Sequence, residues 1–177
     1  MEMMKTANRL LVILMLIGIA HAADLESEVV VVKDGFQWPK EGEVASMLVA
    51  LKITNSSDAA VVINRYDSPV PVFEDASGKP LKVNTGRDVF VAPAKSNYFV
   101  LRARHTIYLN VDVSVVRQGD HYRFYGIGTN GNFWECSGRE SDFSRIGLVY
   151  RSEDHQVVPV SAGVWVGEKV TKMVSFR

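Results

Sequence analysis

Two segments of the sequence alternate between apolar and other side chains with a period of two residues. In residues 47–54 the regularly spaced apolar residues are Met47, Val49, Leu51 and Ile53, and in residues 107–114 they are Ile107, Leu109, Val111 and Val113. Neighbouring side chains of a β-strand point to opposite faces, so this pattern predicts half-buried strands rather than helices. We expect the apolar set of the first segment to face a core, and Leu48, Lys52 and Thr54 to face away from it.

Short β-rich runs separated by turn signals continue along the chain, and no convincing amphipathic helix follows the N-terminal region. The turn signals recur about every 8–12 residues, a spacing typical of β-sandwiches. The polar cluster at 55–58 separates the strand at 47–54 from the next one at 60–64, and we expect these two strands to form a hairpin. The sequence therefore predicts an all-β fold, an antiparallel sandwich.

A series of short segments in a fixed order supports the same fold. They are residues 53–55, 71–73, 78–81 and 86–87, then Pro93 with Ser96, 111–114, Gly119 leading to 122–124, 165–167 and 174–176. In this order they resemble the immunoglobulin-like domains that occur as prodomains of deuterolysin-type metalloproteases, and also the intracellular proteinase-inhibitor type of sandwich. The resemblance implies an immunoglobulin-like antiparallel β-sandwich. The His-Glu-x-x-His zinc helix of a deuterolysin-type protease is absent, so the resemblance extends to the prodomain-like module alone.

The N-terminus has the order of features found in secretory signal peptides. Basic Lys5 and Arg9 precede an apolar run at 10–19, and Ala20-His21-Ala22 supplies small residues at a cleavage site. A membrane anchor is the alternative, but a transmembrane helix needs about 20 apolar residues, twice the length of this run. We expect residues 1–22 to be removed and residues 23–177 to form one domain, exported to the periplasm or the extracellular space.

Composition and motif content narrow the function classes. The chain has 177 residues with 20 basic and 20 acidic side chains, a balance that gives no reason to expect nucleic acid or anionic membrane as a partner. The histidines after the N-terminal region, His105, His121 and His155, lack zinc-ligand spacing, and no Gly-x-Ser-x-Gly elbow or phosphate-binding loop is present. We expect no metal, no cofactor and no catalytic residues.

Two residues in the second half of the chain are assigned structural roles. Cys136 is the only cysteine, so no intramolecular disulfide forms; a buried thiol is the favoured interpretation, and a thiol awaiting a partner is the alternative. Tyr122 enters a late strand directly after a Gly-Asp turn, the position of a tyrosine corner, in which the hydroxyl group bonds upstream backbone. A plain core tyrosine is the alternative.

The stretch at 128–144 is the most unusual part of the sequence, and we expect it to be a loop insertion. Within it, Phe133 and Trp134 stand among glycines and polar residues. Loops often carry function, and Trp and Phe are favoured contact anchors, so these two residues are the candidate binding site, with Trp134 as the main anchor. The alternative is that both rings fold back and cap the core.

The remaining motifs are weaker. Arg102, Arg104 and His105 form a small basic cluster between strands, and Asn55-Ser56-Ser57 is an N-glycosylation sequon on an expected turn. Together these features predict an exported, non-enzymatic binding or scaffold module with a protein partner, which includes a protease-inhibitor-like role. The alternative is a carbohydrate-binding accessory or an enzyme that uses the 128–144 loop. The sequence leaves the oligomeric state open.

Overall fold

The computed structural model describes residues 25–32, 36–87, 91–153, 155 and 164–175. This part of the chain is all-β, and its helices are single 3-10 turns at Lys95–Asn97 and Glu140–Asp142. The prediction of an all-β fold with antiparallel sheets is confirmed. The signal peptide predicted for residues 1–22 lies outside the described residues.

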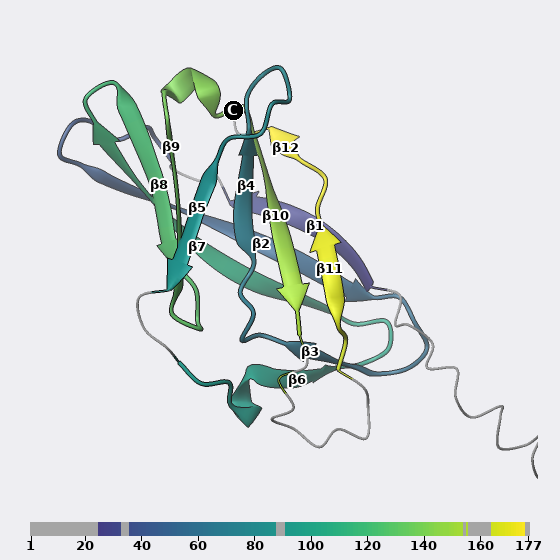
Figure 1. The fold of residues 1–177 in the computed structure, drawn as a ribbon. Coiled ribbons are helices and arrows are strands. Elements are labelled where there is room, and N and C mark those ends of the chain that lie inside the picture. The colour runs from purple at the N-terminus through teal and green to yellow at the C-terminus, as the bar shows by residue number, and fades with distance from the viewer. Residues whose placement is uncertain (1–24, 33–35, 88–90, 154, 156–163, 176–177) are drawn as a thin grey trace, which may run out of the picture.

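The larger sheet has six strands in the order β1, β2, β7, β8, β9 and β5. Their bounds are Leu25–Val32 for β1, Val44–Asn55 for β2, Thr106–Gln118 for β7, His121–Ile127 for β8, Asn132–Gly138 for β9 and Val83–Arg87 for β5. Strands β2 and β7 are the longest and run side by side across the molecule (Figure 1).

The two-residue period of β2 and β7 is confirmed. The buried side chains of β2 include Met47, Val49, Leu51 and Ile53, whereas Leu48, Lys52 and Thr54 stay half-buried on the opposite face. In β7 the buried residues are Leu109, Val111, Val113 and Val115, alternating with the exposed Tyr108, Asn110 and Asp112. Each strand therefore turns one apolar face to the interior, as the alternation predicts.

The second sheet is built around β10. Strand β4 pairs with one edge of β10, and β11 and β12 pair one after the other with its opposite edge. The bounds are Val70–Glu74 for β4, Arg145–Ser152 for β10, Gly167–Val170 for β11 and Val174–Ser175 for β12. Between β11 and β12, Thr171 accepts a hydrogen bond from Leu148 N–H through Oγ1 (2.9 Å) and donates its own N–H to the Leu148 carbonyl (3.0 Å).

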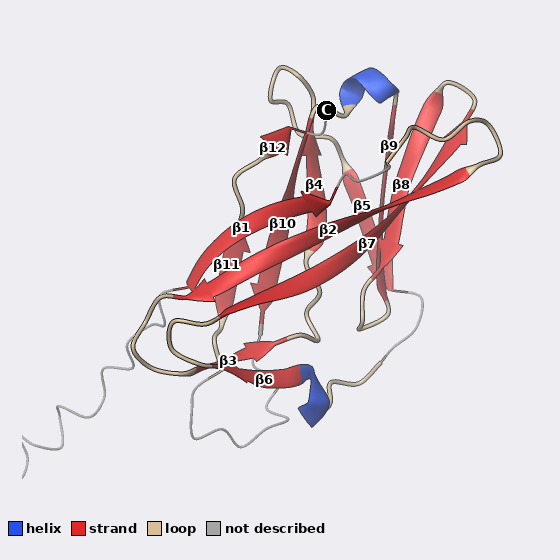
Figure 2. Cartoon of the chain, turned by 180° about the vertical axis from the view of Figure 1, so that it is seen from behind, coloured by secondary structure: helices blue, strands red, loops and turns tan. Residues whose placement is uncertain are grey.

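The two sheets pack face to face in a sandwich-like arrangement (Figure 2). Aromatic rings fill the space between them. Phe73 of β4 lies 5.2 Å from Phe124 of β8, centroid to centroid, and the Phe143 ring lies 4.3 Å from Phe124. Trp38, from the segment between β1 and β2, contacts Phe124 edge-on. These contacts join both sheets and the β1–β2 connection into one core. Among the described residues no helix is long and apolar enough to cross a membrane.

The hairpin expected between 47–54 and 60–64 is wrong. Strand β3 (Val61–Asn64) leaves the large sheet and pairs with β6 (Tyr98–Leu101), while β2 has β1 and β7 as neighbours. The buried Asn55 side chain fixes this departure: its Nδ2 donates to the carbonyls of Ala59, Leu101 and Arg102 at 2.8–3.2 Å. A turn signal shows that the chain changes direction, but not which sheet it enters.

The segment expected to be a loop at 128–144 contains a strand, β9, which lies between β8 and β5 in the large sheet. A tight turn begins it: Gly131 has a positive φ of 75°, Gly128 N–H donates to the Asn132 carbonyl (2.7 Å), and Asn132 N–H donates to Asn130 Oδ1 (3.0 Å). Trp134, Cys136 and Gly138 then face inwards. The polar and glycine residues of this segment hide a two-residue alternation that the sequence interpretation missed.

Candidate functional site

A hollow of the described structure lies where β4 and β5 diverge. These strands form a hairpin around the turn at 75–80, in which Asp75 Oδ1 accepts hydrogen bonds from the N–H groups of Ser77 (2.8 Å) and Lys79 (3.0 Å). Leu81 N–H still donates to the Phe73 carbonyl (2.9 Å). Further from the turn, β4 pairs with β10 and β5 pairs with β9. The hairpin therefore joins the two sheets at one end and leaves a wedge between them at the other.

This wedge is a groove of about 810 Å³, which we call the β4–β5 groove. Apolar side chains on one wall are Val70 and Val72 of β4 and Val149 of β10. On the other wall the ring of Phe133 lies across Gly86, so close that a Cβ at Gly86 would be 2.4 Å from it. Only glycine at this position leaves room for the ring to cover β5.

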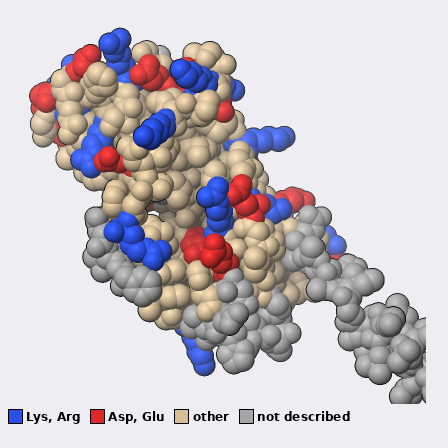
Figure 3. Space-filling view, viewed as in Figure 1, with Lys and Arg blue, Asp and Glu red and all other residues tan. Residues whose placement is uncertain are grey.

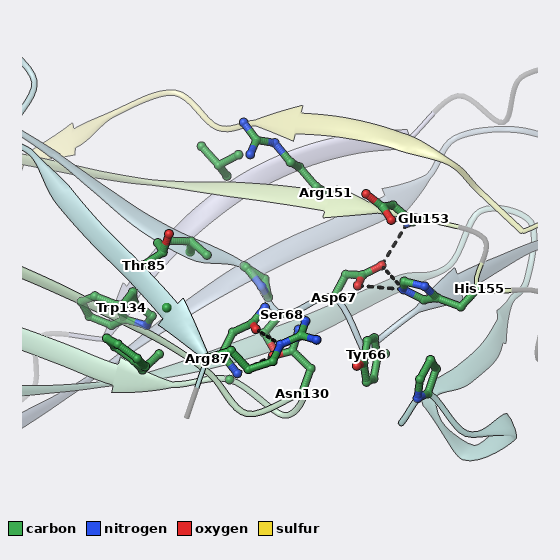
Figure 4. A pocket seen from close by; sticks show the side chains of 18 of the residues that line it. Tyr66, Asp67, Ser68, Thr85, Arg87, Asn130, Trp134, Arg151, Glu153 and His155 are labelled. Atoms are coloured by element: carbon green, nitrogen blue, oxygen red, sulfur yellow. Dashed lines mark hydrogen bonds and ion pairs between the residues drawn. The ribbon is translucent and has the colours of Figure 1, made fainter. Parts of the chain in front are cut away.

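Charged groups border the groove on both sides (Figures 3 and 4). Arg87 of β5 donates from Nε to Asn132 Oδ1 (2.7 Å), and Arg151 of β10 is paired with Glu168 of the neighbouring β11. Glu153 follows β10 and is exposed. The lining is therefore mixed in polarity and near charge balance, which suits a polar backbone with apolar side chains better than a purely apolar ligand.

Asp67 closes one end of the groove. Its carboxylate accepts hydrogen bonds from Asn64 Nδ2 (2.7 Å), Glu153 N–H (2.9 Å) and His155 Nε2 (3.0 Å), and the His155 ring lies edge-on to Tyr66. The Asp67 and His155 side chains are only 17% and 23% exposed. This Asp67 clasp ties the end of β3 to the segment after β10, an arrangement that charge-assisted hydrogen bonds make strong.

Ser68 adjoins the Asp67 clasp but lacks the contacts of a nucleophile. Thr129 Oγ1 donates to the Arg65 carbonyl (3.0 Å), so the 2.9 Å contact between the two hydroxyl groups has Ser68 as the donor. Ser68 Oγ in turn accepts from Thr129 N–H (2.9 Å). Activation of a serine requires a base in hydrogen-bond reach. The hydrogen bonds described for Ser68 lead to Thr129 and not to His155.

The predicted anchor Trp134 lies in the core, not on the surface. Its side chain is 3% exposed, and its ring centroid lies 6.4 Å from that of Phe73. This is the arrangement expected of the core-capping alternative, and no exposed tryptophan face is available for stacking. Phe133, the residue before Trp134, lies on the opposite face of β9. It is half-buried and lines the β4–β5 groove.

The two residues with expected structural roles are both buried. Cys136 is 1% exposed, as the favoured interpretation requires, and its desolvation raises the pKa of the thiol to about 12. Tyr122 packs its ring against Trp38, with centroids 4.6 Å apart. Its hydroxyl group makes no hydrogen bond with another described residue, so the tyrosine corner stays a prediction.

The other motifs do not converge on a site. Arg104 pairs with Asp58 (2.7 Å), and His105 turns its Nδ1 to the Ala103 carbonyl, so two of the three members of the basic cluster are engaged within the protein. His105, His121 and His155 lie apart, at the start of β7, the start of β8 and the end of the groove. Within the described ranges no group of three or more His, Cys, Asp or Glu side chains is placed to hold a metal ion.

The groove residues Asp67, Arg87, Arg151 and His155 were missed by the sequence interpretation. They come from four separate segments, and no spacing rule connects them. The Ser-Pro-Val-Pro sequence at 68–71 is the one local signal, since two prolines mark a strand edge. No protein-family model matches the sequence, and a comparison with curated proteins finds no match.

Proposed function

We propose that the chain is an exported, non-enzymatic binding module with an immunoglobulin-like sandwich, and that it holds a protein partner in the β4–β5 groove. Two sheets packed face to face around an aromatic core support the sandwich type, as does the shift of the chain between sheets at β3 and β4. The signal-peptide pattern at 1–22 supports export.

The observation that carries the proposal is the groove itself. It offers three valines and the Phe133 ring beside the charged side chains of Arg87 and Arg151, a combination of apolar contact and polar rim that protein interfaces use. The nearby serine hydroxyl is committed to Thr129, which supports binding rather than catalysis.

A carbohydrate-binding accessory, or an enzyme built on residues 128–144, is less well supported. The carbohydrate-binding alternative depends on an exposed aromatic face at Trp134, and that ring is buried. The enzyme alternative depends on a loop at 128–144, and residues 132–138 of that segment form strand β9. The groove between the sheets therefore replaces the 128–144 segment as the candidate contact surface. Both predicted binding residues line it, the half-buried Phe133 and the buried Trp134.

The experiment compares two valine-to-arginine variants of the purified protein. Val149→Arg places a long cation in the groove, whereas Val100→Arg adds the same charge on β6, at a side chain that is already 59% exposed. A partner is first captured from the exported fraction with the wild-type chain, identified and purified, and its Kd is then measured by calorimetry.

We expect Val149→Arg to weaken binding at least tenfold and Val100→Arg to leave Kd unchanged. Equal binding by all three proteins would show that the groove is not the contact surface. Melting curves of both variants control for loss of fold.

A further inference from the structure

Strand β5 lies at the end of the six-stranded sheet, so among the described residues one of its edges has no neighbouring strand. The hydrogen bonds of β9 show which backbone N–H and C=O groups of β5 face that free edge. Gly128 N–H donates to the Asn132 carbonyl, so the backbone of Asn132 faces β8. Successive residues of an antiparallel strand direct their backbone groups to opposite sides. Phe133, one residue later, therefore directs its N–H and C=O to β5.

Gly86 is the residue opposite Phe133, so these two form a hydrogen-bonded pair. Thr85, one residue earlier, accordingly turns its N–H and C=O away from β9, and Val83 does the same. Thr85 also lines the β4–β5 groove, so its outward N–H and C=O open into the groove, and Val83 continues the same edge towards the turn at 75–80. A row of unpaired N–H and C=O groups is a template for another strand.

The opposite wall of the groove, the edge of β4 that faces β5, is less able to pair with an added strand. The Phe73 carbonyl accepts from Leu81 N–H, which shows that Phe73 faces β5, and Pro71 is the next residue of β4 to do so. Leu148 lies opposite Pro71, and its N–H and C=O bond with Thr171 on the other side of β10. The backbone groups of Pro71 therefore face β5 and not β10. Proline has no N–H, so this edge of β4 is blunted and β5 is the wall on which a strand can form.

The side chains around the free edge indicate what such a strand carries. Val70, Val72 and Val149 form an apolar wall that side chains on one face of an extended segment would cover. Arg87 and Arg151 stand on opposite walls (Figure 4). A carboxylate beside Arg87 would be complementary in charge to its guanidinium group, whereas that of Arg151 is already paired with Glu168.

We propose that the β4–β5 groove takes an extended segment of a partner protein, which adds as a strand to the free edge of β5 through Val83 and Thr85. The segment carries alternating apolar residues against the valine wall and an acidic residue near Arg87. This inference rests on the proposed binding function and specifies its mode, because backbone pairing selects an extended polypeptide over a folded surface or a small molecule.

The first test uses decapeptides selected on the purified full chain from a random display library. Each selected peptide is resynthesised with a single N-methyl group at successive positions. A strand that pairs along one edge needs every second N–H, so methylation at alternate residues should weaken binding at least tenfold, and methylation at intervening residues should have little effect. A flat profile, or a library that yields no binder, would overturn strand addition.

The second test examines the protein side of the same bonds. Thr85→Pro removes the N–H that faces the groove, whereas Thr85→Val retains it and changes only the side chain. We expect Thr85→Val to bind the selected peptide with an unchanged Kd and Thr85→Pro to lose at least tenfold. Amide hydrogen exchange on the wild-type chain, which is independent of both variants, should show slower exchange at Thr85 when the peptide is bound.

The outcomes separate this inference from the function on which it rests. If a partner binds and Val149→Arg weakens it, but exchange at Thr85 does not change, the binding function stands and strand addition is wrong. Slowed exchange at Thr85 that depends on protein concentration, without peptide, would assign the edge to a second copy of the chain and overturn the proposed occupant. Protection at β1 in place of β5 would likewise contradict the proposal.

Discussion

Trp134 illustrates how one side chain takes a role opposite to the one that its neighbours in the sequence suggest. Glycine and asparagine around a tryptophan favour a contact loop, yet the alternation of β9 turns the ring into the core beside Phe73. The half-buried Phe133, one residue earlier, points the other way. The two adjacent aromatic residues therefore lie on opposite faces of β9, and both line the β4–β5 groove, Trp134 buried and Phe133 half-buried.

The burial of Trp134 gives a prediction for stability. Trp134→Ala should lower the free energy of unfolding by about 3–5 kcal/mol, because a large buried ring is removed and a cavity remains. Phe133→Ala, the neighbouring control, should cost less because that ring is only half-buried. Urea denaturation measures both changes, and an unchanged midpoint for Trp134→Ala would contradict the core assignment.

Cys136 gives a prediction for reactivity and pH. Burial raises the pKa of its thiol from 9.0 to about 12, so the reactive thiolate is scarce in the folded protein. A thiol reagent at pH 8 should label Cys136 only as fast as the protein unfolds. Because the folded-state pKa is the higher one, this group leaves stability intact below pH 9 and lowers it as the pH rises from 9 towards 12. Rapid labelling of the native protein would show an accessible thiol.

At the scale of elements, β2 and β7 could be predicted because each buries one face against the core. The alternation of Met47 to Ile53 is undisturbed by glycine or proline, and the burial follows it. Strand β9 could not be recognised because its inward residues include Gly138 and its outward ones Ser137, which blurs the contrast. The partner of β3 was missed for another reason: pairing depends on the buried hydrogen bonds of Asn55, a tertiary effect without a local pattern.

The confirmed period of β2 leads to a matched pair of variants. Leu51→Ala should destabilise the protein by about 2–5 kcal/mol, because Leu51 is fully buried in the centre of the sheet. Lys52→Ala, one residue later on the opposite face, removes the solvent-exposed ion pair with Glu28 and should cost far less than Leu51→Ala. Thermal and chemical denaturation give both values, and similar costs for the two variants would contradict the assigned faces.

At the scale of the whole molecule, the fold class could be predicted and the candidate site could not. Strand periodicity is local and survives in a single sequence, whereas the β4–β5 groove assembles Asp67, Arg87, Arg151 and His155 from distant segments. Their proximity depends on a hairpin that spans two sheets and on the divergence of its strands. Neither feature leaves a trace in composition or spacing.

Export also concerns the molecule as a whole. The signal-peptide pattern predicts a mature protein that begins at Ala23, after cleavage behind Ala22. Intact-mass spectrometry of natively exported protein should give the mass of residues 23–177. Recovery of a membrane-retained chain that still begins at Met1 would show that the segment is an anchor.

The burial of Asn55 has a consequence for the choice of production host. The side chain is fully buried, and its Nδ2 is the atom to which an N-linked glycan would be attached at the Asn55-Ser56-Ser57 sequon. A eukaryotic secretory pathway attaches such glycans to chains that are still unfolded, and a sugar on Nδ2 would displace its bonds to the carbonyls of Ala59, Leu101 and Arg102. Chains glycosylated at Asn55 could not form these hydrogen bonds, which hold the segment between β2 and β3 in place. A bacterial host avoids that loss, as does a Ser57→Ala variant, which removes the sequon together with the two hydrogen bonds of the Ser57 hydroxyl to Asn55 Oδ1 and the Ala59 carbonyl.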